Sequence, residues 1–148
     1  MLRDLLRGKL FGHPIHVMLI HFPAALLPTA AVLDVLHAFG YLSTSFEITL
    51  LLWPGVVIGW LAAAFGTWDM VRLPQASPQM ARALLHGGIN ATAVTGFTLA
   101  LVLASNPSQQ PLRIAIELLC TALIFTGNKF GGDLIFRFGI GSTKSSSS

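Results

Sequence analysis

Long apolar segments alternate with short polar ones along the chain. A bilayer core about 30 Å thick is crossed by roughly 20 residues of helix. Four segments reach that length, at about residues 17–39, 48–68, 83–104 and 112–136. Stretches rich in Ser, Pro, Asn or Gly separate them. The pattern predicts an all-α integral membrane protein, an antiparallel four-helix bundle. We expect one four-span domain over residues 1–141 and a disordered tail over 142–148.

Composition favours a lipid environment. Hydrophobic residues make up 53% of the 148 and charged ones only 10%, whereas a soluble domain has about 25% charged residues. Three prolines lie inside predicted spans, and a membrane helix tolerates them when neighbouring groups satisfy the freed carbonyls. The single cysteine, Cys120, excludes an internal disulfide framework. No internal repeat is evident in the sequence.

Positive charge is distributed unevenly between the two predicted sides. With four spans, the N-terminus, the second loop and the C-terminus share one side, and that side carries every Lys and Arg except Arg113. The positive-inside rule makes it cytoplasmic, so we expect a multi-pass protein with both termini in the cytoplasm. The net charge of +3 then reflects topology, and no nucleic-acid partner is expected.

Histidines concentrate where the first span begins, in the run GHPIHVMLIHFP. With Pro14 in the first helical turn, His13 and His16 fall at the membrane edge, where they could cap the helix or touch headgroups. His21 lies seven residues past Pro14, about 10 Å along the helix axis, inside the apolar region. Ionisable groups at such depth are costly and therefore informative.

A second histidine is predicted at a similar depth on the third span. His86 lies about 12 Å past Pro78, and Asn90 follows it on the same helix face. Asp69 closes the second span on the same side. We therefore expect His21 and His86 to face each other, with His13 and His16 as reserve ligands.

Further polar groups fall at both predicted ends. On the histidine side, Asp133 near the end of the fourth span could join the same pocket, or balance nearby Lys and Arg at the interface. On the other side lie Asp34, His37 and Glu117. A structural pair of Glu117 with Arg113, one helical turn earlier, is expected there.

Two facing imidazoles would suit a b-type haem, which side chains alone hold and whose axial ligands set the iron potential. His21 and His86 are the expected iron ligands, with His13, His16, Asn90 and Asp69 around the cofactor. Zinc or copper bound by three histidines is an alternative. A quinone bound by His86 and Asp69, and histidines that merely stabilise the core, are others. The sequence contains no P-loop, G-x-S-x-G, H-E-x-x-H or glycine-rich dinucleotide turn.

The histidine run resembles the opening motif H-P-x-H-P-x-L-V-H-F-P of the domain-of-unknown-function 2231 family, small four-span bacterial membrane proteins. Val17 departs from it, since the family commonly has proline there, but valine is not a ligand type. The resemblance extends from about Leu10 to Gly141. The later residues that match are Asp69, His86 and Gly131-Gly132-Asp133-Leu134.

The resemblance implies a bacterial inner-membrane protein. Some family members are joined to, or encoded beside, Rieske-type redox modules, which by association implies electron transport. We therefore expect a small subunit of a larger redox complex, with other membrane or redox subunits as partners and no complete enzyme activity alone. A non-catalytic scaffold or assembly subunit and a metal or small-solute carrier are the alternatives.

Overall fold

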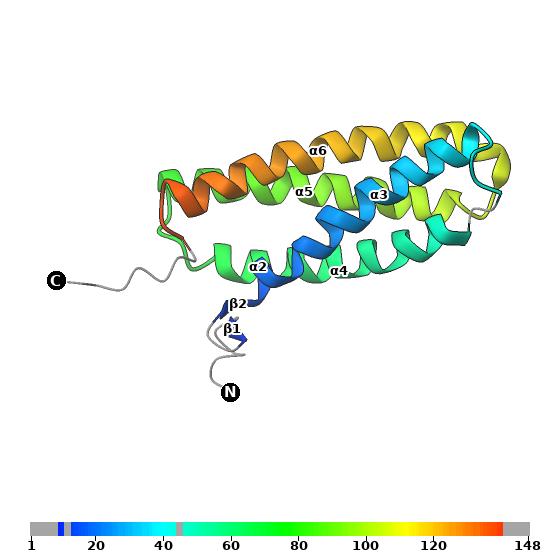
Figure 1. Ribbon diagram of the computed structural model, residues 1–148. Coiled ribbons are helices and arrows are strands. Elements are labelled where there is room, and N and C mark those ends of the chain that lie inside the picture. The colour runs from blue at the N-terminus through cyan, green and yellow to red at the C-terminus, as the bar shows by residue number, and fades with distance from the viewer. Residues whose placement is uncertain (1–8, 11–12, 44–45, 141–148) are drawn as a thin grey trace.

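The computed structural model describes residues 9–10, 13–43 and 46–140 of the chain. Long helices dominate it (Figure 1). The helices are α2 (Ile15–Leu19), α3 (His21–Ala38), α4 (Phe46–Met70), α5 (Pro78–Leu103) and α6 (Gln110–Phe136), with a 3-10 turn η1 (Pro107–Gln109) before α6. Strands β1 (Lys9–Leu10) and β2 (His13–Pro14) form a short antiparallel pair ahead of α2.

Four helical segments of the described chain are long and apolar enough to cross a membrane. They are Ile15–Ala38, Ile48–Met70, Pro78–Leu103 and Pro107–Phe136. The all-α class and the four spans predicted from the sequence are therefore confirmed. The predicted tail over 142–148 lies outside the described residues, and the single-domain assignment stays a prediction.

The spans run antiparallel, and neighbours in the sequence pack side by side (Figure 1). Contacts also join α4 to α5 and α3 to α6, which closes the bundle. We call the end where α2 begins and α6 ends the proximal end. The opposite end, where α3 ends and α6 begins, is the distal end. The first span thus begins, and the last span ends, at the same end of the bundle.

The first span is interrupted but still forms one run across the bundle, with backbone hydrogen bonds from the Ile20 N–H to the His16 carbonyl and from the Ala24 N–H to the Ile20 carbonyl. It is divided at Ile20 into α2 and α3. Pro23 has no N–H to donate to the carbonyl of Leu19, so one rung of the helical ladder is missing at this point. By contrast, α3 continues through Pro28 and α4 through Pro54.

The third span also begins earlier than predicted. Its first residue is Pro78 rather than Ala83, and the Ser77 hydroxyl caps it by accepting from the Met80 N–H at 3.1 Å. A capping serine followed by proline at the first helical position is a strong start for a helix. The predicted ends of the other spans lie within two residues of the observed helix ends.

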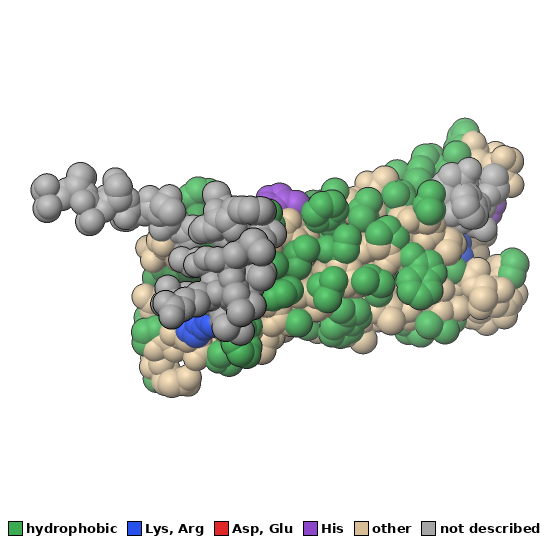
Figure 2. All heavy atoms as spheres, turned by 90° about the horizontal axis from the view of Figure 1, so that it is seen from below, with side chains coloured by type: hydrophobic (Ala, Val, Ile, Leu, Met, Phe, Trp, Pro, Cys, Tyr) green, Lys and Arg blue, Asp and Glu red, His purple; other side chains and the backbone are tan. Residues whose placement is uncertain are grey.

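The apolar core lies between the helices, and much of the exterior is apolar as well. The core comprises Leu27, Ala30, Ile48, Leu52, Val56, Ala93, Phe97, Cys120 and Ile124. Outside, large side chains such as Trp53, Leu119 and Phe125 are exposed. Figure 2 shows hydrophobic side chains along the length of the face it presents, with Lys and Arg only toward its two ends. This distribution matches a surface solvated by lipid.

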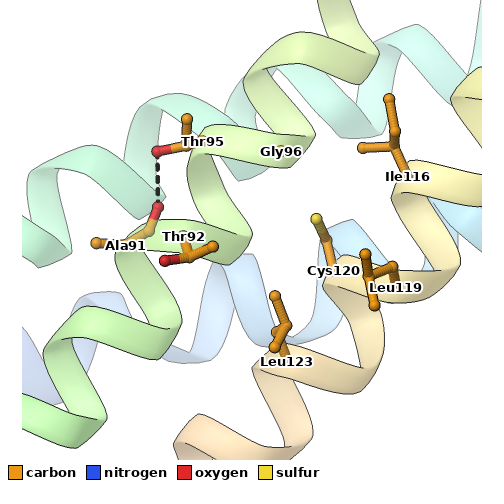
Figure 3. A pocket seen from close by; sticks show the side chains of 8 residues that line it. All are labelled: Ala91, Thr92, Thr95, Gly96, Ile116, Leu119, Cys120 and Leu123. Atoms are coloured by element: carbon orange, nitrogen blue, oxygen red, sulfur yellow. Dashed lines mark hydrogen bonds between the residues drawn. The ribbon is translucent and has the colours of Figure 1, made fainter.

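Helices α5 and α6 approach closely where α5 carries a glycine. Gly96 lies opposite Cys120, whose sulfur points toward it (Figure 3), and an added Cβ would collide with that sulfur. Outside this contact a shallow groove of about 490 Å³ runs between Thr92 and Leu119. The groove is mostly apolar, and the hydroxyls of Thr92 and Thr95, which line it, donate to the backbone carbonyls of Gly88 and Ala91.

Candidate functional site

His16 is held by the following span. Its Nδ1 lies 2.8 Å from the carbonyl oxygen of Ala62 on α4. A carbonyl can only accept, so Nδ1 carries the proton and donates it. In the neutral imidazole the lone pair is then on Nε2. Gly66 makes room for the ring, because a Cβ there would lie 2.9 Å from both Nδ1 and Cε1.

His86 is held in the same way by α6. Its Nδ1 lies 2.8 Å from the carbonyl oxygen of Gly127. The Asn90 amide nitrogen is 3.2 Å from the same Nδ1, but a nitrogen that donates to Gly127 cannot also accept from Asn90. That amide instead donates to the His86 carbonyl at 2.9 Å. A Cβ at Gly131 would lie 2.7 Å from the His86 ring.

The two histidines are thus supported by the same arrangement, used twice. In each case the span after the histidine supplies a carbonyl from a small residue, Ala62 or Gly127. Four residues later, one helical turn further, it supplies a glycine under the ring, Gly66 or Gly131. The repeat consists of small residues rather than a recognisable motif, and for that reason it was not found in the sequence.

The two rings meet in the proximal half of the bundle. The centroids of His16 and His86 are 6.0 Å apart, and the ring planes are nearly perpendicular at 84°. Both rings are half-buried. Within the described part of the chain, neither Nε2 makes a hydrogen bond. Two nitrogen lone pairs are therefore available in one place.

His21 does not take part in this contact. Its side chain is exposed, on the outside of the bundle. The predicted pairing of His21 with His86 is therefore wrong, and the partner of His86 is His16, one of the two reserve ligands. His13 was the other, and its side chain lies outside the described residues.

The error has two physical causes. Five residues turn a helix by about 140° beyond a full circle, so the side chains of His16 and His21 cannot point the same way. In addition, the prediction assumed that the first and third spans begin at one level. In Figure 1, α5 begins further toward the proximal end than α2 does, and the ring beside His86 is that of His16.

Acidic groups surround the proximal end. Asp69 is near enough for its charge to act on the His16 ring, and it forms an ion pair with Arg72 at 3.8 Å. Asp133 pairs with Arg82 at 3.5 Å and with Arg137 at 3.1 Å. No group of three His, Cys, Asp or Glu side chains among the described residues is arranged to hold a metal ion. Both carboxylates take part in ion pairs at this end of the bundle.

The distal half contains a buried charged cluster. Arg113 donates through Nε to Asp34 Oδ2 at 2.5 Å and through Nη2 to Asp34 Oδ1, and Gln110 donates to Oδ1 at 3.1 Å. The expected Glu117–Arg113 pair is present, at 3.9 Å. Sequence reasoning missed Asp34 as the main partner of Arg113, although both residues were placed on the same membrane side.

The fold and these polar sites define an integral membrane four-helix protein with one histidine pair and one buried charge cluster. The sequence profile of the family described as "Predicted membrane protein (DUF2231)" matches residues 12–144. The chain belongs to this family. No curated protein and no solved structure matches it.

Proposed function

We propose that the chain is a small bacterial inner-membrane subunit that carries electrons through a b-type haem held by His16 and His86. The observation that carries the proposal is the pair of imidazoles with both Nδ1 atoms fixed and both Nε2 atoms open, 6.0 Å apart between ring centroids.

The spacing suits two ligands that would hold one metal ion. Metal–nitrogen bonds of about 2.0–2.1 Å place the two ring nitrogens roughly 4 Å apart. Adding about 1 Å from each nitrogen to its ring centre gives a centroid separation of roughly 6 Å. The separation of His16 and His86 agrees with this value.

The donor set favours haem over a bare metal ion. Zinc in proteins takes three or four protein ligands, and the described residues offer no third ligand beside the two histidines. The porphyrin itself supplies four nitrogens to its iron, so His16 and His86 would be enough to hold a haem. Bound there, haem would supply a one-electron couple between ferric and ferrous iron.

The protein's own contribution is to orient the ligands. The carbonyls of Ala62 and Gly127 fix the tautomer and rotation of each ring, as the outer hydrogen bonds of metal-bound histidines generally do.

The catalytic and nucleotide-binding motifs named above do not occur in the sequence. We therefore favour a subunit that passes electrons to partner proteins. The apolar exterior would place the haem within reach of a quinone in the bilayer or of another redox subunit. The one-sided distribution of Lys and Arg supports an orientation with both termini in the cytoplasm.

An optical spectrum of the purified full-length protein tests the proposal. We expect a Soret band that sharpens and shifts on reduction. His16→Ala and His86→Ala should each lose most of the bound haem, because each removes one of the two residues that would hold it. His21→Ala is the matched control, since that exposed side chain is on the same span and outside the pair.

Metal analysis of the same samples separates the alternatives. A colourless protein that stays colourless after incubation with haemin would overturn the haem assignment. Copper bound at one ion per chain, and lost in both pair variants, would indicate a copper carrier. Retention of haem in His16→Ala with loss in His21→Ala would show that the ligands are misassigned.

A further inference from the structure

The buried charge cluster at the distal half contains more negative than positive groups. Asp34 and Glu117 are fully buried, and Arg113 is only 3% exposed. If all three were ionised, two negative charges would face one positive charge. The excess would be one full charge inside the membrane-spanning part of the bundle, where ionised groups are strongly disfavoured.

The single positive charge is already engaged. Arg113 forms two parallel hydrogen bonds with Asp34, the geometry in which guanidinium and carboxylate match best. Gln110 adds a third hydrogen bond to that carboxylate. The Asp34–Arg113 pair is therefore neutral overall and nearly saturated.

Glu117 is the charged group of the cluster whose carboxyl oxygens lack a hydrogen-bond partner in the described structure. Its contact with Arg113, at 3.9 Å, is beyond hydrogen-bond distance. The Thr121 hydroxyl, one turn further along α6, is also buried without a partner. Unpaired oxygens of this kind mark a place that can take a ligand.

No other described charge compensates for Glu117. The only described charged side chains on α4 and α5 are Asp69 and Arg82, both at the proximal end, and His86 is in the proximal half. On α3 the nearest titratable group to Asp34 is His37, which bonds through Nδ1 to the Leu42 carbonyl. On α6 itself, Cys120 is next to Glu117 and is uncharged as a thiol.

We propose that the Asp34–Arg113–Glu117 cluster is a proton-binding site, in which Glu117 takes up one proton from water at the distal side. The carboxylate and the incoming proton form a neutral carboxylic acid, and the cluster becomes neutral as a whole. The new O–H is a donor, and the Asp34 carboxylate nearby is a ready acceptor.

The position of the cluster gives it a route to water. Gln110, bonded directly to Asp34, is half-buried and begins α6 beside the exposed turn η1. Glu117 lies seven residues past Gln110 on α6, which is about 10 Å along the helix axis. The site is thus close to the distal surface and far from the histidine pair, so the two sites can be tested separately.

Infrared spectroscopy of the full-length protein in lipid tests this inference. A protonated carboxyl group gives a separate C=O stretching band that carboxylates lack. We expect such a band at neutral pH, a shift of it in heavy water, and its loss in Glu117→Gln. Glu47→Gln, at the only other glutamate, and Asp133→Asn, in an interface ion pair, are controls that should keep it.

A second variant tests the coupling within the cluster. In Asp34→Asn the guanidinium of Arg113 has only Glu117 as a carboxylate partner, so Glu117 should ionise and the band should disappear. If Glu117→Gln does not fold, the wild-type band and its shift in heavy water still show whether a carboxyl group is protonated at neutral pH.

Several outcomes would overturn the inference. One is the absence of a protonated carboxyl band in the wild type, which would mean that Glu117 is ionised beside a bound cation. Others are a band that does not shift in heavy water, and a band that survives both Glu117→Gln and Asp34→Asn.

Discussion

Replacing Gly131 by alanine should break the support of His86 while leaving the rest of the bundle intact. The new Cβ would lie 2.7 Å from Cε1 and 2.8 Å from Nδ1 of the His86 ring, where ordinary contacts begin at 3.4 Å. The ring must therefore move by more than half an ångström. That movement would lengthen or break its 2.8 Å hydrogen bond to the Gly127 carbonyl.

The magnitude follows from two opposing effects. A partly buried hydrogen bond lost with one partner left unsatisfied costs about 1–3 kcal/mol. Replacing a helical glycine by alanine gains up to about 1 kcal/mol through helix propensity. Gly87→Ala, on α5 with nothing within 4 Å of the added Cβ, has the second effect alone. The free energy of unfolding of Gly131→Ala should therefore be about 1–3 kcal/mol below that of Gly87→Ala.

Reversible unfolding in mixed detergent micelles measures both variants against the wild type. Nitrogen NMR of labelled histidine adds a local readout, because the Nδ1–H signal of His86 should change in Gly131→Ala and stay unchanged in Gly87→Ala. Equal stability of the two variants, with an unaltered Nδ1–H signal, would refute the packing argument. The test does not depend on any bound cofactor.

Two further predictions concern the charge cluster and the topology. Asp34→Ala should lower the free energy of unfolding by about 3–5 kcal/mol, because it leaves Arg113 buried without its carboxylate, whereas Asp133→Ala at the interface should cost about 1 kcal/mol or less by the same unfolding assay. Reporter fusions after Ser148 and within residues 105–110 should give a cytoplasmic signal only for the first, and a cytoplasmic signal from the 105–110 loop would contradict the predicted orientation.

The number and approximate ends of the spans could be predicted from the sequence because they depend on length and hydropathy alone. The presence of a histidine on the first and third spans was predictable for the same reason, since position along an axis follows from residue count. Both predictions describe distance along a helix's own axis, which residue count gives directly, but not the level at which each helix begins.

The direction of each side chain could not be predicted in this way. Whether His16 or His21 points inward depends on the rotation of the first span, which the break at Ile20 and the packing of α2 on α4 determine together. The Asp34–Arg113 pair likewise joins residues 79 positions apart. Periodicity within one helix carries no information about such contacts between helices.

The paired support of the histidines has a consequence for biosynthesis. Spans enter the membrane in sequence order, and each imidazole is fixed by a carbonyl of the span that follows it, Ala62 for His16 and Gly127 for His86. Each helical hairpin can therefore orient its own ligand as it forms. The rings meet only when the second hairpin docks on the first, so the histidine site would be completed after the last span has been inserted.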